Sequence, residues 1–301
     1  MKKKVVSKKK INFGIQYIID LFCITRIYKF SKKYQHERGH KMAIFANDHI
    51  GICINQLGIY EREELEYLSD FLSSVRGTLL NGIVLDIGAN IGNHSLYFSD
   101  LFKEVISFEP HPDTYKLLEF NTSFRTNIRT HNFGLGDARE TVALHENPTN
   151  LGGSSIESES DNHNNSLEIS LQKLDDFVND LQRIDLIKMD VEGYESKVII
   201  GGKNTIKKHQ PIILFEQYAE EFCNGTTETI KLLKAHGYQF CWIENKLSST
   251  TFIGRRIINI FEILFGRNIS ILVGDDVPVK FHSMLIAIPK RFSRDLLGTA
   301  H

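Results

Sequence analysis

The sequence IVLDIGANIGNHSLYF occupies residues 83–98 and decides the fold. It begins as a short apolar run, typical of a strand buried on both faces, and resumes after a turn with apolar residues at near-helical spacing. The pattern predicts a strand, a tight loop and a helix. Gly88 and Gly92 let the backbone turn sharply and approach a ligand, and the helix N-terminus offers unpaired N–H groups. We therefore expect a small cofactor over this loop.

The spacing within the loop narrows the choice of cofactor. A dinucleotide fingerprint, G-x-G-x-x-G, needs glycines where this chain has Asn90 and Asn93. Asp86, at the end of the strand, can anchor the cationic amino group of an amino-acid-like ligand, and Asn90 can hold the loop or contact that ligand. A nucleoside with an amino-acid tail fits better than a dinucleotide, which predicts S-adenosylmethionine.

Composition predicts one large α/β core with appendages, because the chain has 301 residues and 42% hydrophobic content. The formal net charge of −1 combines +10 in residues 1–41 with −11 in the remainder. Four cysteines without a C-x-x-C pattern form neither a disulfide framework nor a zinc site. We expect reduced thiols in a cytoplasmic protein that binds no nucleic acid.

The basic N-terminal arm has two interpretations. Residues 11–30 come closest to a membrane span, but Asp20, Arg26 and Lys29 interrupt them and no signal-peptide cleavage site follows. Apolar residues on one helical face, flanked by lysines within residues 2–33, are typical of a peripheral helix on the anionic cytoplasmic face of a membrane. A helix packed on the catalytic domain with a solvated lysine tail explains them equally well.

Periodicity divides the rest of the chain. We expect residues 1–41 to form a basic amphipathic arm and residues 42–82 a layer with a short strand or hairpin at 43–60 and a helix at 61–75. The main domain spans residues 83–290. It contains an insertion at 245–282 and is followed by a tail at 291–301.

Acidic residues follow several predicted strands. The strand 105–108 leads to Glu109, 21 residues after Gly88, where a carboxylate can accept hydrogen bonds from ribose hydroxyls. A strand near 130–135 leads to Asp137, which can accept from the amine of an adenine, although Asp after Gly is also ordinary turn chemistry. The polar stretch 147–166 is interpreted as a loop that can act as a lid.

The fourth and fifth strands, 184–189 and 212–215, end in three carboxylates: Asp190, Glu192 and Glu216. Ligands bind at this edge of open α/β sheets. Asp190 or Glu192 can serve as a general base for an acceptor hydroxyl. A divalent cation among the three would be chemically reasonable, but no ligand spacing demands it and we predict no metal.

Several ordered motifs resemble the FkbM family of S-adenosylmethionine-dependent methyltransferases: VLDIGANIGNHSLYFS, VISFEPHPDTYKLLEFN, LDDF, IDLIKMDVEGYE and PIILFE, within about residues 58–243. The resemblance implies a class I methyltransferase Rossmann-like α/β fold: a mostly parallel seven-stranded sheet with an antiparallel last strand, here with an N-terminal helical extension. It also implies O-methylation of a hydroxyl on a small molecule or glycan, often a sugar or secondary metabolite. Asp86, Gly88, Asn90 and Gly92 would hold the methionine part, Glu109 the ribose and Asp137 the adenine.

Two other functions remain open. A nicotinamide-dependent oxidoreductase shares the glycine loop and Glu109. A non-catalytic membrane-docking protein with a vestigial domain explains the basic arm, but it gives no reason for an intact set of cofactor residues.

Overall fold

The computed structural model describes residues 14–38, 41–145, 156, 166–178, 181–245 and 269–298. The chain divides into two compact units, Met1–Arg62 and Glu63–His301. The boundary falls inside the layer predicted for residues 42–82, because the helices that follow Arg62 contribute buried leucines, Leu65 and Leu68, to the second unit.

The first unit contains helices α1 (Ile15–Arg38) and α2 (His49–Leu57). The strand or hairpin predicted at residues 43–60 is wrong, since α2 occupies half of this stretch and the rest contains no strand. The Asp48 carboxylate accepts a hydrogen bond from the Gly51 N–H at 3.2 Å, and Gly58 ends the helix at φ +86°. An aspartate at the N-cap and a glycine after the last turn are helix signals that outweigh a loose alternation of apolar residues.

Helix α1 exposes apolar side chains in more than one direction. Ile15, Ile18 and Phe22 lie on one face, as predicted, whereas the equally exposed Ile24 lies opposite Ile15, because each residue advances about 100° around the axis. The amphipathic character of the arm stays a prediction. Within the described residues, no helix combines the length and apolarity needed to cross a bilayer.

The second unit is built on an eight-stranded sheet in the order β10-β9-β11-β8-β7-β1-β2-β3. Its strands are β1 (Ile83–Ile87), β2 (Glu104–Phe108), β3 (Ile128–His131), β7 (Leu186–Met189), β8 (Ile212–Gln217), β9 (Gln239–Asn245), β10 (Ile269–Gly274) and β11 (His282–Ile288). The five strands from β8 to β3 pair in parallel, whereas β11 is antiparallel to both β8 and β9.

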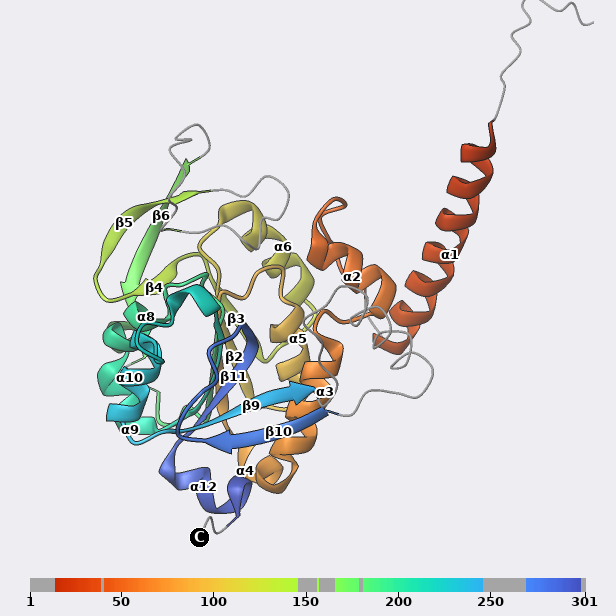
Figure 1. Cartoon of the computed structure of the whole chain (residues 1–301). Coiled ribbons are helices and arrows are strands. Elements are labelled where there is room, and N and C mark those ends of the chain that lie inside the picture. The colour runs from red at the N-terminus through yellow and green to blue at the C-terminus, as the bar shows by residue number, and fades with distance from the viewer. Residues whose placement is uncertain are drawn as a thin grey trace, which may run out of the picture. The chain divides into compact units, whose positions relative to one another are not determined.

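This sheet confirms the predicted α/β class and the antiparallel last strand. The predicted number of seven strands is one too few, because β10 lies inside the expected insertion 245–282 and pairs antiparallel with β9 at the sheet edge (Figure 1). Within this insertion, the sequence IINIFEILF at residues 257–265 is markedly apolar, and it lies outside the described residues. The predicted tail begins as helix α12 (Lys290–Leu297), where the Arg291 guanidinium donates to the buried Asp185 carboxylate at 2.8 Å.

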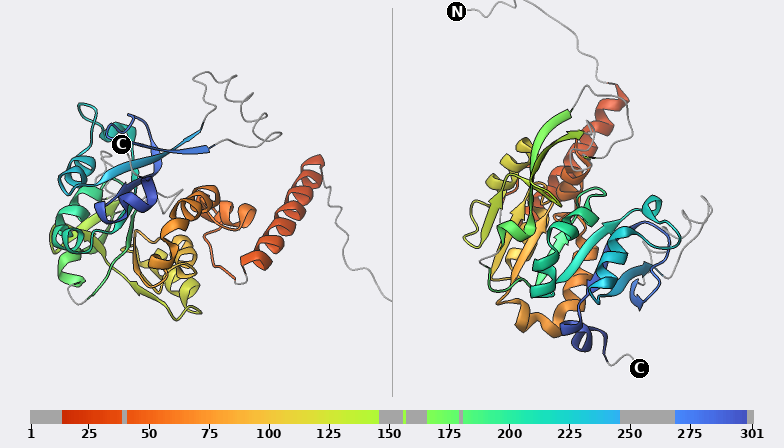
Figure 2. Two further views of the ribbon diagram at one scale, coloured as in Figure 1. Left: turned by 90° about the horizontal axis from the view of Figure 1, so that it is seen from below. Right: turned by 90° about the vertical axis from the view of Figure 1, so that its left-hand side faces the viewer.

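Helices cover both faces of the main sheet (Figures 1 and 2). One group contains α3 (Arg62–Phe71), the 3-10 turn η1 (Leu72–Val75), α4 (Arg76–Leu79), α5 (Asn93–Ser99) and α6 (Pro112–Thr122). The other contains α7 (Leu174–Phe177), α8 (Glu195–Gly201), α9 (Lys203–His209) and α10 (Glu228–Ala235). Central strands such as β1 and β7 are buried on both faces, which explains why their sequences are apolar apart from Asp86 and Lys188.

A second, three-stranded sheet lies beside the carboxyl edge of the first. It consists of β4 (Gly134–Gly136), β6 (Ser166–Lys173) and β5 (Glu140–His145), in that order. The strand predicted near 130–135 is thus divided between the two sheets. A Cβ on Gly134 would lie 2.6 Å from the Leu171 side chain, so a glycine allows β4 to approach β6. Most of the predicted lid, residues 147–166, lies outside the described residues.

Candidate active site

A pocket opens where β1, β2 and β7 end, and the small sheet forms its other wall. The polar lining residues include Asn90, Glu109, His111, Thr114, Asp190 and Glu192, next to the backbone of Gly88; the apolar ones include Leu135, Leu144, Ile156, Ile169, Leu171 and Tyr194. Ile156 belongs to the GGSSI segment within the stretch interpreted as a lid. The pocket therefore combines polar groups at the strand ends of the main sheet with apolar side chains from both sheets, among them Ile87 and Phe108 of the main sheet.

The glycine loop takes a backbone that few residues allow. Gly88 has φ +73°, and a Cβ there would lie 1.9 Å from the Asp190 carbonyl oxygen, so only glycine fits between the two strand ends. Asn90 has φ +50°, and its side-chain oxygen accepts a hydrogen bond from the Ile91 N–H at 2.7 Å. A short polar side chain of this kind tolerates the left-handed conformation.

Glu109 is held at the pocket wall by two backbone donors. Its carboxylate accepts from the Asn90 N–H and from the His111 N–H, both at 2.9 Å. Burial raises its pKa to about 7, although these hydrogen bonds act in the opposite direction. Each carboxylate oxygen keeps the capacity for a second hydrogen bond, which is what two ribose hydroxyls require.

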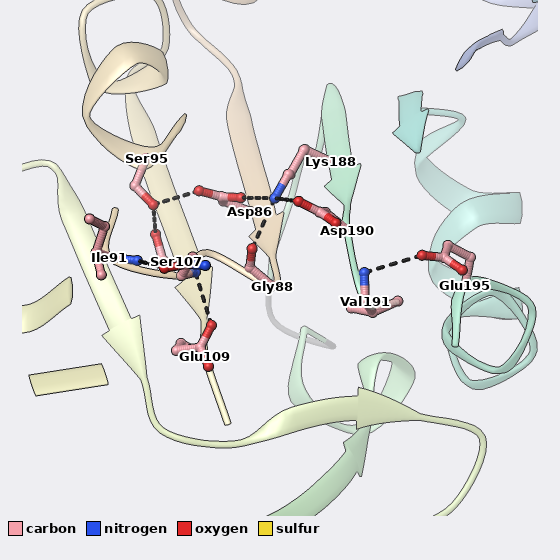
Figure 3. A network of polar contacts seen from close by, with 11 residues as sticks. Asp86, Gly88, Ile91, Ser95, Ser107, Glu109, Lys188, Asp190, Val191 and Glu195 are labelled. Atoms are coloured by element: carbon pink, nitrogen blue, oxygen red, sulfur yellow. Dashed lines mark hydrogen bonds and ion pairs between the residues drawn. The ribbon is translucent and has the colours of Figure 1, made fainter. Parts of the chain in front are cut away.

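Three other predicted cofactor residues lie away from the pocket surface. Asp86 is fully buried: the Ser95 hydroxyl donates to it at 2.6 Å, and a second serine, Ser107, lies 2.8 Å from that hydroxyl (Figure 3). Gly92 packs against α6, because a Cβ there would lie 2.9 Å from Leu118. Within the described part of the chain, none of these residues lines the pocket, so the structure does not support their direct contact with the cofactor.

Asp137 is the third of these residues. It follows β4, and Gly201 at the end of α8 packs so closely that a Cβ there would lie 3.3 Å from the Asp137 Cα. The chain leaves the main sheet after His131, which carries Asp137 over α8. Asp137 does not line the pocket in the described residues, so its predicted adenine contact is likewise unsupported.

The carboxylates at the ends of β7 and β8 lie close together. Three carboxylate oxygens, one each from Asp190, Glu192 and Glu216, lie within 4.8 Å of one another. Glu192 has φ +53° and accepts a hydrogen bond from the Tyr218 hydroxyl at 2.9 Å. Burial and, to a lesser extent, the charge of Asp190 raise the Glu192 pKa to about 7. A carboxylate with this pKa can accept a proton near neutral pH. Acidic groups gather in this way without a metal as well, and we assign none.

Lys188 is a site residue that sequence reasoning missed. It lies on β7, is 7% exposed, and its ammonium group donates to the Gly88 carbonyl at 2.9 Å. The same group lies 3.5 Å from an Asp86 oxygen and 3.4 Å from an Asp190 oxygen (Figure 3). The available signal was a lysine inside an otherwise apolar strand, since a buried charge requires partners.

Glu195 shapes the turn after β7. Its carboxylate accepts a hydrogen bond from the Val191 N–H at 3.1 Å, and burial raises its pKa to about 8. Glu195 lies at the start of α8, where an acidic side chain stabilises a helix N-terminus. Its contact with Val191 is consistent with this structural role.

The chain is similar to known methyltransferases. The sequence profile of the methyltransferase FkbM domain matches residues 86–240, just over half of the 301-residue chain. Methyltransferase 1 of Beauveria bassiana is 27% identical over 145 residues, which cover 40% of this chain and 58% of that protein. The 2-O-methyltransferase NoeI of Sinorhizobium fredii is 28% identical over 159 residues, which cover 46% of this chain and 64% of that protein.

The chain thus spans less than two thirds of the length of these two relatives. Among solved structures, a methyltransferase FkbM from Methylobacillus flagellatus KT is 18% identical and has a TM-score of 0.38; the match covers 90% of this chain and 60% of that one. The profile match includes the glycine loop, Glu109 and the strand that ends in Asp190. The chain belongs to the methyltransferase FkbM domain family.

Proposed function

We propose that the protein is an S-adenosylmethionine-dependent O-methyltransferase that acts on a hydroxyl of a small molecule or glycan. The main observation in support is that one pocket contains Glu109, the glycine loop and the carboxylates Asp190 and Glu192. We assign the reaction to residues 83–290. The family and the names of the relatives support the reaction class, and NoeI is named as a 2-O-methyltransferase.

The pocket suits the chemical groups of S-adenosylmethionine. Glu109 offers a carboxylate to the ribose hydroxyls, and the backbone of Gly88 and Asn90 provides polar groups for the amino-acid part. The apolar wall of Leu144, Ile169 and neighbouring residues can cover a flat adenine ring. When bound, S-adenosylmethionine supplies a methyl group on a positively charged sulfur.

Glu192 and Asp190 act on the acceptor. A hydroxyl is a weak nucleophile until its proton is transferred, and a general base typically contributes about 10²–10⁴-fold to the rate. Held by Glu109 and the glycine loop, S-adenosylmethionine would supply the methyl group and keep the electron pair of the broken bond on its sulfur, and Glu192 would accept the proton of the acceptor hydroxyl. Asp190 orients the hydroxyl. Holding the reactants at attack distance contributes further.

Mass spectrometry tests the proposal directly. The purified protein is incubated with methyl-labelled S-adenosylmethionine and a panel of glycan and metabolite acceptors. We expect a labelled methyl ether in at least one product. Thermal-shift measurements with S-adenosylmethionine and with NAD, added separately, distinguish the alternative: stabilisation by NAD alone would favour an oxidoreductase.

We further propose that the arm, through residues 2–33, contacts an anionic membrane surface at the cytoplasmic face. The support is the coincidence of exposed apolar side chains on α1 with Lys29, Lys32 and Lys33 near its C-terminal end. Each basic residue near such a surface adds about 1 kcal/mol, and salt weakens the attraction. Co-sedimentation with anionic liposomes should fall when the chain starts at Lys41. Equal sedimentation of both proteins contradicts the proposal.

A further inference from the structure

Lys188 occupies an unusual place for a charged side chain. Its strand, β7, lies between β1 and β8, and the side chain is almost fully enclosed. A buried ammonium group is costly unless oxygen atoms surround it. The contacts that Lys188 makes are therefore informative about its role.

The ammonium group connects three segments of the site. It donates to the Gly88 carbonyl in the glycine loop, and it pairs with Asp86 at the end of β1 and with Asp190 at the end of β7 (Figure 3). The contact with Gly88 is a hydrogen bond, whereas the contacts with the two carboxylates are longer ion pairs, at 3.5 Å to Asp86 and 3.4 Å to Asp190. One side chain thus links the loop beneath the methyl donor to the carboxylate on the acceptor side.

The contact with Asp190 does more than balance a buried charge. Asp86 is fully buried and requires a cationic partner, whereas the Asp190 side chain is 39% exposed and water can solvate it. An ion pair with such an accessible carboxylate contributes little to stability. Its main consequence is to fix where the Asp190 oxygens lie relative to Gly88.

We propose that Lys188 is a positioning residue for methyl transfer: it fixes the Asp190 carboxylate against the glycine loop and offsets the negative charge around the donor. This inference rests on the proposed function. The pocket also contains Glu109 and Glu192, so Lys188 reduces the attraction of the site for a cation. That effect favours the neutral thioether product over the sulfonium substrate.

The first experiment needs no acceptor. Calorimetry measures the affinities for S-adenosylmethionine and for S-adenosylhomocysteine in the parent, Lys188→Met, Lys188→Arg and Ser107→Ala. We expect the affinity ratio to shift about three- to tenfold toward S-adenosylmethionine in Lys188→Met, because one positive charge is lost. Lys188→Arg retains that charge, and Ser107→Ala disturbs the same buried network without changing charge, so both should keep the parent ratio.

A purely structural role would lower both affinities together and leave the ratio unchanged. A folded Lys188→Met protein with the parent ratio therefore overturns the inference. If Lys188→Met does not fold, Asp86→Asn/Lys188→Met removes both buried charges together. Compared with Asp86→Asn alone, this double variant should show the same shift, and an unchanged ratio there is equally decisive.

The second experiment is a double-mutant cycle on turnover, with an acceptor from the labelled panel. Because Lys188 acts in part through Asp190, Lys188→Met should slow turnover less in the Asp190→Asn background than in the parent. Independent, multiplied losses would assign Lys188 to the scaffold and contradict positioning. If no acceptor is methylated, the proposed function fails, while the affinity ratio still decides the role of Lys188 at the donor site.

Discussion

Replacing Glu109 with glutamine should change the stability of the protein in opposite directions at low and high pH. Burial raises the pKa of this carboxyl from 4.5 to about 7 in the folded chain. A raised pKa means that the folded state favours the protonated form of Glu109. The contribution of this preference to the free energy of unfolding is fully present below pH 4.5 and is lost as the pH rises through 7. At about 1.4 kcal/mol per unit, the parent loses roughly 3 kcal/mol by pH 8.

Glutamine cannot ionise, so the variant avoids this loss. Glutamine has one acceptor oxygen, however, and either the Asn90 or the His111 N–H loses its partner, which costs about 1 kcal/mol. The variant should therefore be about 1 kcal/mol less stable than the parent at pH 4 and about 2 kcal/mol more stable at pH 8.

Urea unfolding without added cofactor, followed by fluorescence of the buried Trp242, measures both differences. Glu119→Gln, at an exposed glutamate on α6, is the matched control: it keeps Glu109, so its stability should differ from that of the parent by the same amount at both pH values. An equal difference between Glu109→Gln and the parent at the two pH values would refute the reasoning. Ionisation of Glu109 would then not lower the stability of the folded protein.

Three further predictions concern the acceptor side and the glycine loop. Asp190→Asn and Glu192→Gln should bind S-adenosylmethionine nearly as the parent does, while turnover falls at least about tenfold. Glu192→Gln should also lose the rise in rate through about pH 7. Parent rates in both variants would exclude these carboxylates from catalysis. Tyr218→Phe removes a hydrogen bond that lowers the Glu192 pKa, so the acidic limb of the pH–rate profile should move to higher pH, and an unmoved limb contradicts that link. Gly88→Ala forces a Cβ against the Asp190 carbonyl and should lower the melting temperature markedly. Gly77→Ala is the control, because Gly77 has open space around it, and it should leave the melting temperature unchanged. Equal melting temperatures for the two variants would contradict the prediction and show that the loop can shift.

Local signals predicted the parts of the fold that depend on local structure. The apolar run from Ile83 followed by glycines predicted β1, the loop and α5, because buried strands and tight turns leave direct marks in the sequence. Glu109, Asp190 and Glu192 were predicted for a related reason: each follows a strand, and parallel strands bring their carboxyl ends to one edge.

The predicted cofactor residues that do not line the pocket have contacts that sequence spacing does not show. Asp86 was expected to reach the ligand, but Lys188, 102 positions later, and Ser95 bind its carboxylate inside the protein. Asp137 was expected at the pocket because the strand before it was expected to continue in the main sheet. The pairing of β4 with β6 changes that path, and it depends on residues far along the chain.

The separate packing of the small sheet has a consequence for how substrate recognition can diversify. Leu144, Ile169, Leu171 and Tyr194 form an apolar cluster distinct from the main core. Substitutions there alter part of the apolar lining of the pocket while the strands that present Glu109 and Asp190 keep their own packing. Larger or smaller side chains in β5 and β6 can therefore change which ligands the pocket accepts without first destabilising the strands that carry Glu109 and Asp190.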